Sequence, residues 1–114
     1  MGTFTKGDVV LFPFPFTDLT SRKLRPCLVL SHEMGEDILL CQITSKQTRK
    51  DEYSIELKQD ETLNGNLTID SYIRANMLFT AATKQVHMKF CRISNEKYTL
   101  VTETIHNLIK KEGH

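Results

Sequence analysis

The sequence has no apolar run long enough to cross a membrane. Even a stretch such as Cys27 to Leu30 is only four residues long, whereas a helix needs about 20 apolar residues to span a bilayer. The N-terminus also lacks the charged segment followed by an apolar segment that marks a secretory signal peptide. We therefore expect a soluble, cytoplasmic protein with no membrane partner.

Cysteines are too few and too widely spaced for a disulfide framework. The three, Cys27, Cys41 and Cys91, are odd in number and form no CxxC pair. Cys27 and Cys41 fall within apolar strand patterns, where a thiol packs as a small hydrophobic side chain. We expect all three to be reduced and structural. The one hint of a reactive thiol is His87, four residues before Cys91.

A strong net charge is also missing. Fifteen Lys and Arg residues against 14 Asp and Glu residues leave a net charge of +1, so composition alone does not indicate a nucleic-acid partner. The charges are nevertheless sorted along the chain. The basic residues form three groups, Arg22/Lys23/Arg25, Lys46/Arg49/Lys50 and Lys84/Lys89/Arg92, and acidic residues gather between the last two. These groups could converge into a basic concavity suited to a polyanion, or each could be an ordinary solvated loop.

Repeats, linkers and low-complexity segments are absent, and 114 residues suffice for one modest core. We expect a single domain over residues 1–114. Strand patterns fill the first two thirds of the chain, at Val9–Phe14, Cys27–Ser31, Asp37–Thr44, Tyr53–Leu57, Ser71–Arg74 and Met77–Ala81, with a turn at Asn64–Asn66.

The last part of the chain has helical spacing. Ser94 is the predicted N-cap, and the predicted apolar stripe comprises Tyr98, Val101, Ile105, Leu108 and Ile109. Lys110, Lys111 and Gly113 are typical of a helix end. Strands followed by one terminal helix indicate a mainly β fold with a C-terminal helix (α+β), built as a small barrel.

One arginine occupies an informative position. Arg25 precedes Pro26, which favours an extended backbone, and we expect it at the entry to the apolar strand that begins at Cys27. An arginine fixed there can direct its planar, permanently charged fork at a phosphate. The alternative is a salt bridge to Asp8 or Asp18.

Four segments together resemble the PemK/MazF family of toxins from bacterial toxin–antitoxin systems. They are Gly7-Asp8-Val9-Val10-Leu11, Phe14-Pro15-Phe16-Thr17-Asp18-Leu19, Leu24-Arg25-Pro26-Cys27-Leu28-Val29-Leu30-Ser31 and Ile43-Thr44-Ser45-Lys46. A weaker match continues through Gly65, Leu67, Asp70 to Arg74 and the terminal helix. Each segment alone is common, but their order and spacing are jointly specific. The sequence departs from the usual pattern at Cys27, where a small apolar residue is common, and at Cys91, where a glycine is often found.

The resemblance implies a homodimeric, SH3-like barrel that cleaves single-stranded mRNA at short sequences without a metal or cofactor. The implied products carry a 2′,3′-cyclic phosphate and a 5′-hydroxyl, and Arg25 and Thr44 are the implied catalytic pair. RNA carries its own nucleophile, so the enzyme needs only to align it, move protons and stabilise charge. Arginine stays protonated, so the group that removes the 2′ proton is left open.

Further residues are candidates for RNA contact. Phe14 and Phe16 are either core residues or stacking platforms, with Phe16 preferred for stacking. The other predicted RNA-binding residues are polar or basic and stand near strand ends: Thr17, Ser45, Lys46, Arg49, Ser71 and Asn76. No histidine has a cysteine or carboxylate at metal-ligand spacing, so we predict no metal site.

The resemblance also implies a protein partner, a cognate antitoxin whose inhibitory segment is acidic and partly disordered. Two other interpretations stay open. One is a gyrase-poisoning toxin of the same fold, which acts by binding a protein through its C-terminal helix. The other is a catalytically silent binding module. Retention of both Arg25 and Thr44 favours the ribonuclease.

Overall fold

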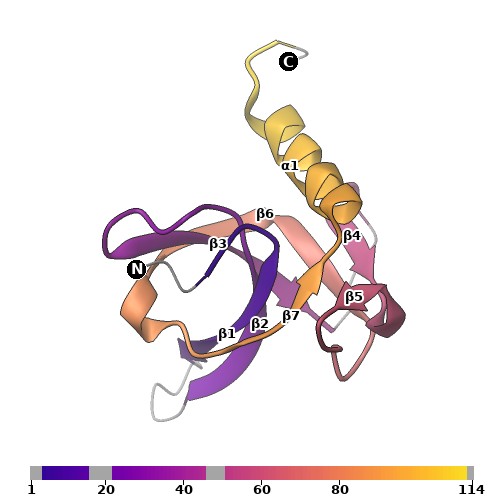
Figure 1. Cartoon of the computed structure of the whole chain (residues 1–114). Helices are drawn as coiled ribbons and strands as arrows, with labels where there is room; N and C mark the ends of the chain where they lie inside the picture. The colour runs from indigo at the N-terminus through magenta and orange to yellow at the C-terminus, as the bar shows by residue number, and fades with distance from the viewer. Residues whose placement is uncertain (1–3, 16–21, 46–50, 113–114) are drawn as a thin grey trace.

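The computed structural model describes residues 4–15, 22–45 and 51–112, and these form one curled sheet with a terminal helix (Figure 1). The elements in chain order are β1 (Asp8–Pro15), β2 (Arg22–Val29), β3 (Asp37–Thr44), β4 (Ser54–Leu57), the 3-10 turn η1 (Gln59–Glu61), β5 (Thr62–Leu63), β6 (Ser71–Ala82), the 3-10 turn η2 (Thr83–Gln85), β7 (Lys89–Ile93) and α1 (Asn95–Ile109). No helix in this described part of the chain is long and apolar enough to cross a membrane.

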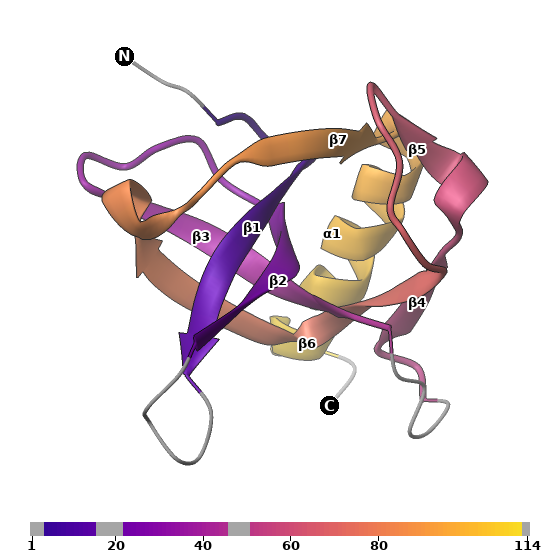
Figure 2. The ribbon, with the colours of Figure 1, turned by 90° about the horizontal axis from the view of Figure 1, so that it is seen from below.

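The seven strands lie in the order β4-β6-β3-β2-β1-β7-β5, and neighbouring strands are antiparallel. The sheet curls so far that its two ends approach each other, and α1 lies across the opening between them (Figure 2). This curvature brings β7 and the chain around β5 close to the start of β6. The fold is therefore a nearly closed barrel with one helix, as the sequence predicts.

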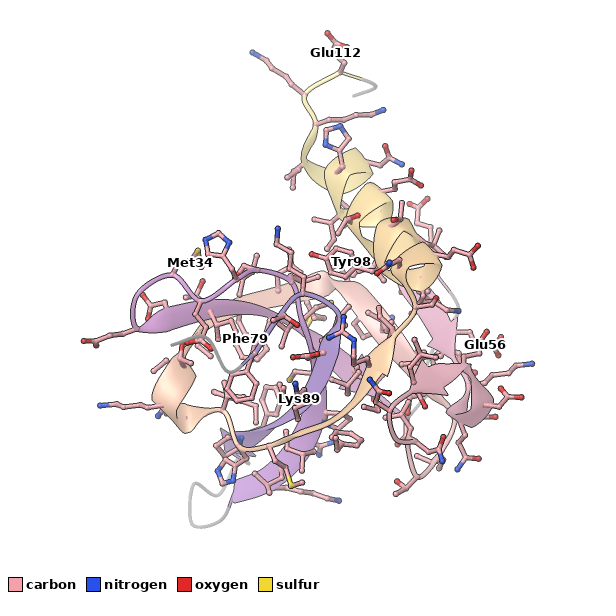
Figure 3. The ribbon with its side chains drawn as sticks, viewed as in Figure 1. Met34, Glu56, Phe79, Lys89, Tyr98 and Glu112 are labelled. Atoms are coloured by element: carbon pink, nitrogen blue, oxygen red, sulfur yellow. The ribbon has the colours of Figure 1, made fainter. Side chains whose placement is uncertain are left out.

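The sheet carries a hydrophobic core on each face. Successive strand residues point to opposite faces, so Val9 and Leu28 belong to one buried cluster, whereas Val10 and Cys27 belong to the other. Val101 of α1 packs into the first cluster. Phe12, Phe14 and Phe79 pack on the second, with ring centroids 5.3 to 5.5 Å apart (Phe79 is labelled in Figure 3).

Two predicted short strands are one continuous strand. The prediction separated Ser71–Arg74 from Met77–Ala81, but β6 runs unbroken from Ser71 to Ala82. Its pairing with β3 shifts register between Cys41 and Ile43, so the predicted break is an irregularity within a strand rather than a turn.

The helix forms where its spacing predicts it. The Ser94 hydroxyl caps it by accepting a hydrogen bond of 3.1 Å from the Lys97 amide. Tyr98 donates its hydroxyl to the Leu30 carbonyl at 2.7 Å and points from α1 toward the sheet (Figure 3). The predicted apolar stripe is buried only at its start, because α1 extends beyond the barrel. Leu108 is 39% exposed and Ile109 is 73% exposed.

Candidate functional site

A groove with a volume of about 480 Å³ opens beside the ends of β2 and β3. Its other walls are β1, the start of β6, the loop before β6, and β7. The lining residues are Leu11, Lys23, Leu24, Arg25, Pro26, Ile43, Thr44, Ser45, Leu67, Thr68, Ile69, Ser71 and Phe90. Four residues predicted to form the site are therefore part of one groove: Arg25, Thr44, Ser45 and Ser71.

Arg25 lies inside β2 and not at its entry. The prediction placed the start of the strand at Cys27, but pairing with β1 extends β2 back to Arg22. Arg25 pairs directly with Phe12, and directly paired residues of an antiparallel ladder share a face of the sheet. Arg25 is thus a half-buried arginine on the face of the aromatic cluster, and it also lines the groove.

Thr44 is the last residue of β3 and pairs with Tyr72 of β6. The last pair of the β2–β3 ladder is Cys27 with Gln42, so Arg25 and Thr44 each lie two residues beyond it, on strands that both border the groove. The cation and the hydroxyl that the family resemblance implies as a catalytic pair therefore line the same groove. This shared location would allow both side chains to approach one phosphate group.

The two serines differ in their surroundings. Ser45 follows β3 directly and is exposed. Ser71 is only 2% exposed, and its hydroxyl donates to the Ile69 carbonyl at 2.9 Å. This bond fixes the end of the loop before β6. Asn76 is exposed on β6 and is not among the residues that line the groove. The RNA-contact roles of all three stay predictions.

Four predicted RNA-binding residues lie outside the described residues: Phe16, Thr17, Lys46 and Arg49. Phe14 is described, and its ring lies edge-on to Phe12 and Phe79. These contacts, together with the second core cluster beneath them, favour the core interpretation of Phe14 over the stacking one.

The third basic group does not converge on the groove. Arg92 and Lys89 instead pair with Asp8, whose side chain is completely buried. The Lys89 Nζ lies 3.8 Å from one carboxylate oxygen of Asp8, and the Thr5 amide donates to the same oxygen at 2.8 Å. Asp8, one of the two acids considered as a partner of Arg25, is therefore engaged by β7. Among the described residues, the cations that line the groove are Lys23 and Arg25.

The cysteines are free and buried, as expected. Burial raises the pKa of Cys27 and Cys41 to about 12 and that of Cys91 to about 11. His87 therefore does not make Cys91 a nucleophile. Within residues 4–15, 22–45 and 51–112, no three His, Cys, Asp or Glu side chains are grouped so that they could hold a metal ion.

The sequence interpretation missed one wall of the groove. Leu67, Thr68 and Ile69 of the loop before β6, together with Phe90 of β7, line it. Neither β5 nor β7 was predicted, because β5 has only two residues and the five residues of β7, Lys89–Ile93, show no regular alternation of polar with apolar residues. The Asn64–Asn66 turn was the available signal. It marked the loop but not the strand on which the loop rests.

The sequence matches the family model described as PemK-like, MazF-like toxin of type II toxin–antitoxin system over residues 5–109. The chain belongs to this family. A search of curated proteins gives no significant match.

Solved structures support the assignment of this MazF-like toxin at the level of the fold. A MazE–MazF structure from Deinococcus radiodurans has a TM-score of 0.75 at 14% identity, covering 93% of this chain and 95% of that chain. An endoribonuclease in complex with its cognate antitoxin, from a mycobacterial species, has a TM-score of 0.69 at 10% identity, covering 92% and 93%. The Mycobacterium tuberculosis toxin MazF-mt6 has a TM-score of 0.68 at 17% identity, covering 88% and 93%.

Proposed function

We propose that this MazF-like toxin is an endoribonuclease that cleaves single-stranded mRNA at a short sequence. The observation that carries the proposal is the groove that contains both Arg25 and Thr44 in a member of this toxin family. The mycobacterial endoribonuclease solved with its cognate antitoxin shares the fold over nearly the whole chain, which supports the same activity here.

The chemistry follows from the two groups. The Arg25 fork can donate two parallel hydrogen bonds to the non-bridging oxygens of the scissile phosphate, and the Thr44 hydroxyl can donate a third. The 2′-oxygen attacks phosphorus, the bond from phosphorus to the 5′-oxygen breaks, and the 2′ proton leaves as the 5′-oxygen gains one. The products are a 2′,3′-cyclic phosphate and a 5′-hydroxyl. Charge develops on the phosphorane oxygens, where donors fixed in advance stabilise the transition state most.

We propose that this reaction needs no metal or cofactor, because the nucleophile belongs to the substrate and a permanent cation meets the phosphate. The protein is proposed to act in the cytoplasm as a homodimer. We also propose that a cognate antitoxin with an acidic, partly disordered segment blocks the groove. The cations Lys23 and Arg25 are complementary to such a segment. The relative solved with its cognate antitoxin supports this partner class.

The testing experiment is incubation of the purified protein with a defined pool of single-stranded RNAs, with and without excess chelator, followed by mapping of the new 5′ ends. We expect cuts at one short motif, with 5′-hydroxyl ends. Loss of activity with chelator would refute the metal-independent mechanism. No cleavage at all would favour one of the two non-nuclease alternatives, the gyrase poison or the silent binding module.

A further inference from the structure

The groove that holds Arg25 and Thr44 has a second, apolar wall. Besides its polar residues it is lined by Leu11, Leu24, Pro26, Ile43, Leu67, Ile69 and Phe90. Two of these are well exposed, Leu24 at 42% and Ile69 at 54%. Burying exposed apolar surface against a ligand is favourable. A ligand that is charged on one side and flat and apolar on the other therefore fits this groove.

Phe90 is the one aromatic residue that lines the groove in the described part of the chain, and a β-bulge places it there. On β7, Arg92 pairs with Asp8 and Cys91 with Val9, but the next pairing joins Val10 to Lys89 and skips Phe90. Phe90 is thus the extra residue of the bulge. A bulge redirects the side chain that it carries, and bulges are common beside binding sites. The Phe90 side chain remains partly exposed while it packs against the first core cluster.

The turn that contains Gly65 packs against the backbone of Phe90. Gly65 has a φ of +133°, and a Cβ atom built on it would lie 2.0 Å from the Phe90 carbonyl oxygen. The loop after β5 therefore rests directly on the backbone of the bulge. Only a residue without a side chain permits this approach.

The rest of the loop is also fixed by hydrogen bonds. The Gln59 amide donates to the Asp70 carboxylate at 2.9 Å, and the Gln59 side chain donates to the Leu67 carbonyl at 3.2 Å. With the bond from Ser71 to the Ile69 carbonyl, these contacts hold the apolar wall in place before any ligand binds. A wall formed in advance lowers the entropic cost of binding.

We propose that Phe90 is a base-binding residue, against which one unpaired nucleobase of the RNA stacks while the adjacent phosphate is held at Arg25. The inference rests on the proposed ribonuclease function and adds the site for the base. Aromatic residues bind unpaired bases by stacking. A groove of about 480 Å³ lies within the usual size range of ligand sites. Leu24 and Ile69 would complete the apolar surroundings of the base.

The test uses binding of an RNA that carries a 2′-deoxy nucleotide at the cleavage position, so that affinity is measured without turnover. Phe90→Leu keeps the apolar bulk and removes the aromatic face. We expect its Kd to rise by about three- to thirtyfold, equivalent to about 0.6–2 kcal/mol, because leucine keeps part of the apolar contact but cannot stack as an aromatic ring does. On cleavable RNA, KM should rise with kcat within about twofold, because stacking stabilises bound substrate and transition state alike. The matched control is Met88→Leu, an exposed residue two positions away that does not line the groove.

An abasic scan of the RNA identifies the base. At one position, removal of the base should weaken binding to the wild-type protein and to Met88→Leu, but not further weaken binding to Phe90→Leu. Phe90→Tyr should restore wild-type behaviour. Should Phe90→Leu unfold, Ile69→Ala gives a second test at a well-exposed position, with a smaller loss at the same base.

Two failures are distinguishable. If the wild-type protein cleaves RNA, and Phe90→Leu binds and cleaves equally well with no coupled position in the scan, the base site is wrong while the nuclease stands. If the wild-type protein neither binds nor cleaves RNA, both proposals fall together.

Discussion

Arg25 and a lysine at the same position would carry the same charge but differ in geometry. The guanidinium presents two parallel donors to a phosphate, whereas the ammonium is a single compact point of charge. Arg25 is half-buried in the middle of β2, so the strand backbone restricts where its fork can lie. We therefore expect that a positive charge at position 25 does not give full cleavage activity without the two parallel donors of the guanidinium.

We therefore predict that Arg25→Lys lowers the cleavage rate by about tenfold to a thousandfold, equivalent to about 1.4 to 4 kcal/mol of transition-state stabilisation. Single-turnover cleavage measures the rate, and thermal denaturation should show an unchanged midpoint. Equal rates with matching midpoints would make Arg25 a structural residue.

The cysteines give a second prediction at this scale. Burial raises the pKa of Cys27 and Cys41 to about 12 and of Cys91 to about 11, so almost no thiolate forms in the folded protein at pH 8. We expect iodoacetamide to label none of the three in the native state and all three in denaturant, as read by mass spectrometry. In the unfolded chain these thiols ionise near pH 9, so the free energy of unfolding should fall as pH rises from about 9 to 12. Rapid labelling of the native protein would contradict the assignment.

At the scale of elements, the bulge of β7 and the turn after β5 depend on each other. Gly65 combines a φ of +133° with a close approach to the Phe90 carbonyl. Gly35 has a φ of +67°, and a Cβ atom at that position would meet no described atom within 4 Å. Both glycines thus have a backbone conformation that residues with a side chain rarely adopt, and they differ in steric contact.

We predict that Gly65→Ala lowers the free energy of unfolding by about 3 kcal/mol or more, because the added methyl group must move either the turn or the bulge. Gly35→Ala should cost only about 1–2 kcal/mol, the penalty of the left-handed backbone. Chemical denaturation measures both. Equal losses in the free energy of unfolding for the two variants would show that the contact between Gly65 and the Phe90 carbonyl does not contribute to stability.

The sequence predicts an element well where the residues that determine its bounds are neighbours along the chain. Residues 37–44 contain the continuous apolar run Ile38 to Cys41, which is typical of a strand buried on both faces, and β3 has the predicted bounds. Ser94 likewise marks the start of α1, because its hydroxyl has a local partner. Pairing partners are not local. The backward extension of β2 to Arg22 depends on β1, and the continuity of β6 depends on β3 and β4. Arg25 and Thr44 are identified by family resemblance, whereas Phe90 enters the groove through a bulge that only pairing reveals.

At the scale of the whole molecule, the C-terminal half of α1 carries apolar side chains that no part of the described barrel covers fully. Leu108 and Ile109 continue the helix stripe but are 39% and 73% exposed. Apolar residues at helical spacing normally face a partner. The proposed second copy of the chain is one that could cover them.

We predict a dimer at micromolar concentration by sedimentation, and a shift toward monomer for Ile109→Glu, because burying a carboxylate in an interface is costly. The dissociated Ile109→Glu variant should stay folded, and its thermal midpoint should fall only because the contacts of the interface are lost. Glu103→Lys, a charge change at another exposed position of α1, is the control and should stay dimeric. A wild-type monomer would refute the dimer and leave the proposed role of the groove untouched.

In the proposed mechanism, the RNA supplies its own nucleophile to a phosphate held by Arg25 and Thr44. The most direct measurement compares cleavage of one RNA with that of the same RNA carrying a single 2′-deoxy nucleotide at the cleavage position, in excess chelator. We expect the deoxy RNA to bind with similar affinity and not to be cut, while the normal RNA yields a 2′,3′-cyclic phosphate and a 5′-hydroxyl. Equal cleavage of the two RNAs would contradict this mechanism.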